Sequence, residues 1–130
     1  SRDEVFTRYS TRGPLSKLSP SALALYATYG FEDNTNGVTL RCKKEDEEQI
    51  YKSGTNNNVF NVLDKVTCPN IVAHGEFSTT VDRKQAELIG TKLKSKDIRT
   101  LPGVGHFTLL ENTLLGAQEI TRFIDSINND

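Results

Sequence analysis

The pattern of polar and apolar residues predicts two short helices within residues 1–29. Ser1 and Glu4 have the spacing of a capping box, in which each side chain binds a backbone N–H of the first turn, so a short helix is expected to begin here. Ser19-Pro20 has the form of a helix cap followed by a first helical residue, and it predicts a second helix over residues 21–29. Gly30 then stands where a left-handed residue commonly ends a helix.

A charged connection separates these helices from the rest of the chain. Residues 38–42 alternate inward- and outward-facing side chains, which predicts a short strand or extended arm. Residues 43–52 are mostly charged, so any helix that they form lies on the surface. From residue 59 the density of apolar residues rises, and we therefore expect a first part over residues 1–58 and a second part over residues 59–130.

The second part has the strand–helix–strand rhythm of a parallel sheet. Residues 70–74 form a short, nearly continuous apolar run, typical of a strand buried on both faces, and residues 98–101 predict the next strand. Between them, residues 82–93 predict an amphipathic helix, which completes a βαβ unit. The last helix carries an apolar stripe that is expected to cover the sheet, made of Ile120, Phe123, Ile124 and Ile127.

Composition and charge narrow the range of functions. The chain has 16 basic and 17 acidic side chains and a net charge of -1, so neither nucleic acid nor a membrane surface is an expected partner. Cys42 and Cys68 match neither a disulfide framework nor the paired spacing of a zinc site, and we expect buried thiols in a reducing, cytoplasmic compartment. Thr108 stands where a dinucleotide-binding loop needs its third glycine, so no cofactor is expected. No cysteine or carboxylate cluster at coordinating spacing accompanies His74 and His106, so no metal is expected either.

The residues best placed for chemistry lie in the loop after the last predicted strand. Residues 101–107, Leu-Pro-Gly-Val-Gly-His-Phe, present a histidine before an acidic residue, Glu111. Catalytic groups of open α/β sheets gather at the carboxyl ends of parallel strands, and imidazole takes and returns a proton near neutral pH. His106 is therefore a candidate general base, and a purely structural role in the loop is the alternative. His74 is expected to be a core histidine whose ring is hydrogen-bonded.

Two motifs in a fixed order give the chain a resemblance to a known family. Residues 68–76, Cys-Pro-Asn-Ile-Val-Ala-His-Gly-Glu, followed about thirty residues later by the His106 loop and Glu111, resemble the end of the α/β-hydrolase fold. The resemblance implies an α/β fold, a partial three-layer parallel sheet with its last strand–helix–strand–helix, and His106 as catalytic base. Residues 26–42 are similar to the cap of some microbial hydrolases, which makes residues 1–58 the later part of a helical cap. The implied substrate of the complete enzyme is a small ester-like or apolar molecule.

The chain departs from the family pattern at two points. It contains no nucleophile elbow of the G-x-S-x-G type, so we expect the chain alone to be inactive. The position that holds the catalytic acid in many members is occupied by Ser78. Glu76 and Asp82 flank this position and are candidate acids. The preferred alternative, as in relatives of the haloalkane dehalogenase type, is an acid that follows an earlier strand, outside this chain.

Two hypotheses follow from these observations. In the first, the chain is the C-terminal fragment of an α/β-hydrolase and supplies the catalytic histidine and part of the lid. In the second, it is a non-catalytic interaction module, derived from a hydrolase, that self-associates through its exposed sheet. Two strands cut from a larger sheet leave an open edge and an uncovered apolar face, so a homodimer is expected in either case. Tyr26, Tyr29 and Phe31 either line a substrate pocket under the cap or pack on a helix face.

Overall fold

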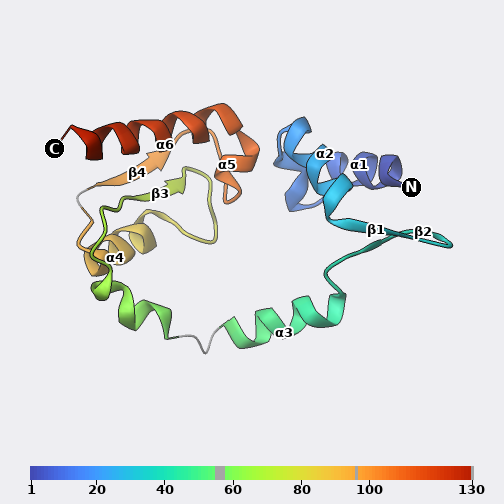
Figure 1. Ribbon diagram of the computed structural model, residues 1–130, viewed down its shortest axis with the longest axis horizontal. Coiled ribbons are helices and arrows are strands. Elements are labelled where there is room, and N and C mark those ends of the chain that lie inside the picture. The colour runs from blue at the N-terminus through green and yellow to red at the C-terminus, as the bar shows by residue number, and fades with distance from the viewer. Residues whose placement is uncertain (55–57, 96, 130) are drawn as a thin grey trace. The chain divides into compact units, whose positions relative to one another are not determined.

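The computed structural model describes residues 1–54, 58–95 and 97–129, and the chain divides into two compact units, Ser1–Asn57 and Asn58–Asp130. The first unit is built from helices and a hairpin, and the second holds a parallel pair of strands between helices (Figure 1). No helix within the described ranges is long and apolar enough to cross a membrane. The candidate catalytic residues all belong to the second unit, which therefore positions the site.

The first unit contains the helices that the sequence predicted. Its elements are α1 (Arg2–Thr11), the 3-10 turn η1 (Pro14–Lys17), α2 (Pro20–Tyr29), β1 (Phe31–Asn34), β2 (Gly37–Leu40) and α3 (Lys44–Gly54). The predicted capping box is confirmed, because the Ser1 hydroxyl accepts from the Glu4 N–H at 3.3 Å and the Ser1 amine donates to the Glu4 carboxylate at 2.6 Å. Ser19 caps α2, and the charged helix α3 is exposed along its length.

The end of α2 differs from the prediction. Gly30 has φ −76° and ψ −8°, which is right-handed rather than left-handed. Its carbonyl accepts from the Arg41 N–H at 3.0 Å, and the next residue, Phe31, already pairs with Leu40 in the antiparallel β1–β2 hairpin. The chain thus passes from the helix directly into a strand and needs no left-handed reversal. The strand β1 itself was not predicted, because its polar sequence, Phe-Glu-Asp-Asn, has no alternating apolar face.

An aromatic cluster holds the first unit together. The rings of Tyr9, Tyr26 and Phe31 lie with their centroids 5.7–6.3 Å apart, and Tyr26 meets each of the other two nearly edge-on. Burial raises the pKa of Tyr26. Tyr29 instead points to solvent within its unit, with 67% of its surface exposed. The packing explanation therefore accounts for Tyr26 and Phe31, and Tyr29 is not part of this cluster.

The second unit contains the predicted parallel pair of strands. Its elements are the 3-10 segment η2 (Val59–Lys65), β3 (Val72–Gly75), α4 (Arg83–Leu93), β4 (Ile98–Leu101), α5 (Thr108–Glu111) and α6 (Thr113–Asn128). β3 and β4 run parallel with Val72 opposite Ile98 and Gly75 opposite Leu101, which confirms the expected strand–helix–strand unit. Both strands therefore end at the same edge of the sheet.

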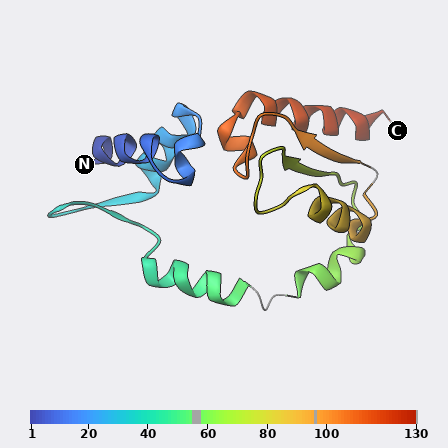
Figure 2. The ribbon, with the colours of Figure 1, turned by 180° about the vertical axis from the view of Figure 1, so that it is seen from behind.

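Helices cover the two faces of this small sheet. In Figure 1 the strands lie between α6 and α4, and the view from behind shows the same order (Figure 2). α4 packs on the face that carries Ile98, and its Ala86 is completely buried. α6 is joined to the opposite face by a hydrogen-bonded ion pair, in which the Arg99 guanidinium donates to the Glu119 carboxylate at 3.1 Å. The result is a three-layer arrangement in which the described residues of this unit form two strands.

The apolar residues of α6 are less covered than the sequence predicted. Ile120, Ile124 and Ile127 are 51%, 49% and 39% exposed, whereas the buried residues of the helix are Gly116 and Glu119. β3 is also not buried on both faces as expected, because Ala73 is exposed. Both corrections have the same cause. α6 is bonded to β4, and within the described residues β4 is the strand that pairs with β3, so no third strand covers the α6 stripe or Ala73.

The two cysteines also differ from the prediction. Cys42 and Cys68 are free but exposed, not buried. Cys42 lies just after the hairpin, and Cys68 lies in the loop before β3. In neither place does a sheet or a helix cover the side chain.

Candidate active site

The site is built where the two parallel strands end. The Glu76 N–H donates to the Leu101 carbonyl at 2.9 Å, and the Phe77 N–H donates to the Val104 carbonyl at 3.0 Å, so the loops after β3 and β4 stay joined. Gly75 is required for this close approach. A Cβ atom at Gly75 would lie 2.0 Å from the Gly105 carbonyl oxygen. The sequence thus brings the loop that carries His106 directly against the end of β3.

His106 is exposed at this edge, with its Nδ1 atom facing Ser78. The distance from the Ser78 Oγ to Nδ1 is 3.5 Å, at the outer limit for a hydrogen bond. Ser78 is itself buried, and its Oγ accepts from the Val81 N–H at 3.1 Å. Serine therefore occupies the place beside Nδ1 where the family resemblance leads one to expect a carboxylate. In the part of the chain that the structure describes, Nε2 makes no hydrogen bond.

Two carboxylates brace the backbone of the His106 loop. The Gly103 N–H donates to the Glu76 carboxylate at 2.8 Å. The Gly105 N–H and the Phe107 N–H donate to the two oxygens of Glu111 at 2.7 and 3.1 Å. Glu111 belongs to the sequence motif, but these bonds were not predicted. Its short spacing after His106 is the signal that could have suggested them.

Each of the two candidate acids has another partner in this structure. Glu76 is exposed and binds the Gly103 N–H. Asp82 caps α4, where its carboxylate accepts from the Gln85 N–H at 2.8 Å and the Gln85 side chain binds the Asp82 N–H. Of the described contacts with the His106 ring, the polar one comes from Ser78. His106 thus contacts Ser78, whereas the carboxylates of Glu76 and Asp82 accept hydrogen bonds from backbone N–H groups.

His74 is the buried histidine that the sequence predicted. It is 6% exposed, its Nε2 lies 2.9 Å from the Thr100 Oγ1, and its Nδ1 lies 3.1 Å from the Gly75 carbonyl oxygen. Since Nδ1 faces a carbonyl, it carries the proton, and Nε2 accepts from the Thr100 hydroxyl. Within the described ranges, no group of three or more His, Cys, Asp or Glu side chains is arranged to hold a metal ion.

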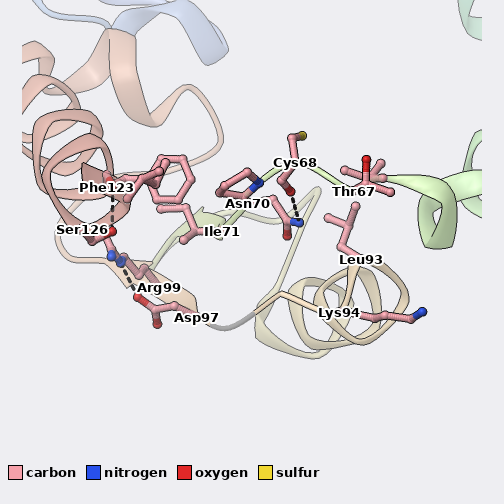
Figure 3. A pocket seen from close by; sticks show the side chains of 13 residues that line it. Thr67, Cys68, Asn70, Ile71, Leu93, Lys94, Asp97, Arg99, Phe123 and Ser126 are labelled. Atoms are coloured by element: carbon pink, nitrogen blue, oxygen red, sulfur yellow. Dashed lines mark hydrogen bonds and ion pairs between the residues drawn. The ribbon is translucent and has the colours of Figure 1, made fainter. Parts of the chain in front are cut away.

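A cavity of about 660 Å³ lies at the opposite edge of the sheet, far from His106 in the strand direction. Figure 3 shows it between the loop before β3, the end of α4 and α6. Two of its polar side chains already have partners: Arg99 binds Asp97 and Glu119, and Asn70 binds Ser95. The hydrogen bond with Asp97 raises the pKa of Arg99. Neither histidine lines this cavity, so the candidate active site is the His106 edge.

Comparison with solved structures finds matches that cover almost all of this chain. A structure titled E-2-(acetamidomethylene)succinate hydrolase aligns with a TM-score of 0.81 at 19% identity, covering 95% of this chain and 45% of that one. A thioesterase domain from the curacin biosynthetic pathway aligns with a TM-score of 0.61 at 15% identity, covering 90% and 40%. A marine microorganism esterase aligns with a TM-score of 0.54 at 20% identity, covering 95% and 45%.

These matches establish the fold of the chain and show how much of each matched structure it corresponds to. At these identities the likeness concerns the fold alone, and the chain spans less than half the length of the structures that it matches. No protein-family model and no curated protein sequence matches the chain.

Proposed function

We propose that this chain, which has the fold of the C-terminal part of an α/β-hydrolase, supplies the catalytic base His106 to a hydrolase of small ester-like or apolar substrates. The observation that carries the proposal is the placement of an exposed imidazole at the carboxyl edge of two parallel strands. Catalytic groups of open α/β sheets gather at this edge because the loops there converge without interrupting the strands. The matched structures are a hydrolase, a thioesterase and an esterase, which supports the same class of reaction.

The proposed mechanism uses the two nitrogens of His106 differently. Nδ1 faces Ser78, so Nε2 is the atom that takes the proton from an attacking hydroxyl. The hydroxyl oxygen bonds to the ester carbonyl carbon, and Nε2 returns the proton to the alkoxide as its bond to that carbon breaks, which leaves the acyl group on the attacking residue. Water then attacks the acyl carbon, and Nε2 takes a proton from the water and returns it to the departing hydroxyl, which frees the acid. The attacking hydroxyl has to come from a segment other than this chain, because the sequence contains no G-x-S-x-G elbow. The chain alone is therefore expected not to hydrolyse esters.

The acid of the proposed mechanism also comes from another segment. Ser78 cannot stabilise an imidazolium as a carboxylate does, and Glu76 and Asp82 are each committed to backbone N–H groups. This supports an acid that follows an earlier strand of the complete sheet. Glu76 and Asp82 stay the alternatives within this chain.

The first unit is proposed to be part of the lid of that enzyme. The alignments cover 90–95% of this chain, so this unit too has a counterpart in hydrolase structures. Its helices and aromatic cluster form a compact unit of their own.

We also propose a cytoplasmic location, which the two free thiols support. Cell fractionation with an antibody to the chain would test it.

A second candidate function is a self-associating module without catalysis. The exposed apolar residues Ile120 and Ile124 on α6, and the edge of β3 that is not paired with β4, favour association with a second copy. We expect a homodimer, measured by light scattering over a hundredfold dilution series. Ile124→Lys should shift the dimer towards monomer, whereas Leu88→Lys on α4, at a similar exposure, should not. A monomer at every concentration would contradict this candidate.

Ester hydrolysis separates the two candidates. We would measure hydrolysis of p-nitrophenyl acetate and butyrate by this chain and by the longest polypeptide that the surrounding reading frame encodes. The proposal expects turnover only in the longer polypeptide and its loss in His106→Ala. Turnover by this chain alone, or turnover in the longer polypeptide that survives His106→Ala, would contradict the proposed function. A longer polypeptide that neither hydrolyses esters nor contains an elbow serine would favour the self-associating module.

A further inference from the structure

We propose that Glu111 is the positioning residue of His106, acting through the backbone rather than through the ring. The proposal rests on the proposed function of His106 as a base. The two oxygens of the Glu111 carboxylate accept from the N–H groups immediately before and after His106, those of Gly105 and Phe107, at 2.7 and 3.1 Å. A single side chain thus holds two peptide units of the loop, Val104–Gly105 before the histidine and His106–Phe107 directly after its Cα atom.

The need for such a residue follows from how little holds the His106 ring. The ring is exposed, and its polar contact in the described part of the chain is the 3.5 Å approach of Ser78. A contact of this length contributes little orientation, because hydrogen bonds weaken steeply beyond about 3.2 Å. The Phe107 ring lies 5.6 Å away, centroid to centroid, and belongs to the same loop. The direction of the imidazole is therefore set mainly by the backbone that carries it.

The local sequence is arranged to bring Glu111 back to this loop. The short helix α5 begins directly after Phe107, and the Leu110 and Glu111 N–H groups both donate to the Phe107 carbonyl, at 2.7 and 2.9 Å. The turn returns the carboxylate to the start of the loop, where the Thr108 hydroxyl also donates to the Gly105 carbonyl at 2.9 Å. A Cβ atom at Gly105 would lie 3.0 Å from the Glu111 Oε1, so a glycine makes room for the carboxylate.

Glu111 differs from the other carboxylate on this loop. Glu76 is exposed and holds one N–H, that of Gly103, three residues before the histidine. Glu111 is half-buried and holds the two N–H groups that flank it. Hydrogen bonds to a charged acceptor are shorter and about twice as strong as neutral ones, and partial burial shields them from water. These differences assign the positioning role to Glu111.

The backbone bonds are tested in this chain by NMR. Glu111→Ala should accelerate amide hydrogen exchange of Gly105 and Phe107 at least tenfold and lower the backbone order parameter of His106 from about 0.85 to below about 0.6. Glu111→Gln keeps one acceptor oxygen, so only one of the two amides should lose its protection. The amides of the β3–β4 ladder report whether the unit stays folded. Glu87→Gln, which removes an exposed charge paired with Arg83 on α4, is the matched control and should change none of these values. Unchanged exchange at both amides in Glu111→Ala would overturn the proposal.

The role in positioning is tested by kinetics in the longer, esterase-active polypeptide. Glu111→Gln should lower kcat about tenfold or more and leave KM within about twofold, because substrate binding does not involve the misplaced base. Faster amide exchange with an unchanged kcat would show that Glu111 only stabilises the loop, and would overturn the proposal while His106 stays the base. Activity that is unaffected by His106→Ala would instead refute the proposed function, and with it any positioning of a base. The two failures are therefore distinguishable.

Discussion

A methyl group at Gly75 perturbs the contact on which the geometry of the site depends. In Gly75→Ala the new Cβ atom would lie 2.0 Å from the Gly105 carbonyl oxygen and 2.6 Å from that of Val104. An ordinary contact begins near 3.4 Å, so the loop has to retreat by about 1.4 Å from the end of β3. That movement breaks the bond between the Phe77 N–H and the Val104 carbonyl, 3.0 Å long in the native chain.

The expected cost follows from these contacts. Overpacking costs about 1–3 kcal/mol, and each buried backbone group that loses its partner costs about 1–3 kcal/mol more. Gly75→Ala should therefore lower the free energy of unfolding of the second unit by about 3–5 kcal/mol. Urea denaturation followed by circular dichroism, with hydrogen exchange of the β3 and β4 amides, measures this loss.

Gly90→Ala is the matched control for this prediction. A Cβ atom at Gly90 would lie 2.7 Å from the Ile98 Cδ1, which is the end of a flexible side chain rather than backbone. Alanine in the middle of α4 also gains about 0.5–1 kcal/mol over glycine. The two effects offset each other, so this variant should stay within about 1 kcal/mol of the native chain. A loss of less than about 1 kcal/mol in Gly75→Ala would refute the close approach of the two loops.

Two further predictions concern charged pairs. Arg99→Leu leaves the Glu119 carboxylate, only 10% exposed, with Arg122 as its remaining partner, and should cost about 1–2 kcal/mol in urea denaturation. Additional replacement of Glu119 by leucine should recover part of that loss, and a larger loss in the double variant would contradict the pairing. The hydrogen bond from Arg2 holds the pKa of Asp33 below its usual value of 3.8. The pair therefore stabilises the fold fully above pH 3.8, and this stabilisation is lost as the pH falls through the lowered pKa of Asp33. Thermal unfolding of Asp33→Asn should lack this acid-dependent part of the stability, and identical pH profiles for the two proteins would contradict it.

Features set by neighbouring residues could be predicted from the sequence. The capping box at Ser1 and the Ser19 cap each need only four consecutive positions, and both helices form where predicted. The parallel strands and the helix between them were predicted from their apolar periods, and the loop with His106 follows from the end of the last strand. These predictions succeed because each depends on interactions within one element or between elements close in sequence.

Features set by distant packing could not be predicted in the same way. The apolar stripe on α6 was expected to be covered, but an amphipathic pattern shows only which face is apolar and not whether a partner lies against it. One link from α6 to the sheet is an ion pair between Arg99 and Glu119, 20 residues apart. The bonds from Glu111 to two backbone N–H groups also have no signature in residue type, since any exposed glutamate looks the same in sequence.

Chemical rescue of His106 tests the central claim most directly. In the longer, esterase-active polypeptide, His106→Ala should lower kcat about a thousandfold or more, and imidazole added to the buffer should restore a measurable part of it, because the vacated position is exposed and open to a small base. The restored rate should rise with imidazole concentration beyond that of Glu87→Gln treated in the same way. A histidine that serves only the structure of its loop would leave kcat largely intact when replaced, or would leave a loss that imidazole does not restore, and either result would contradict the account.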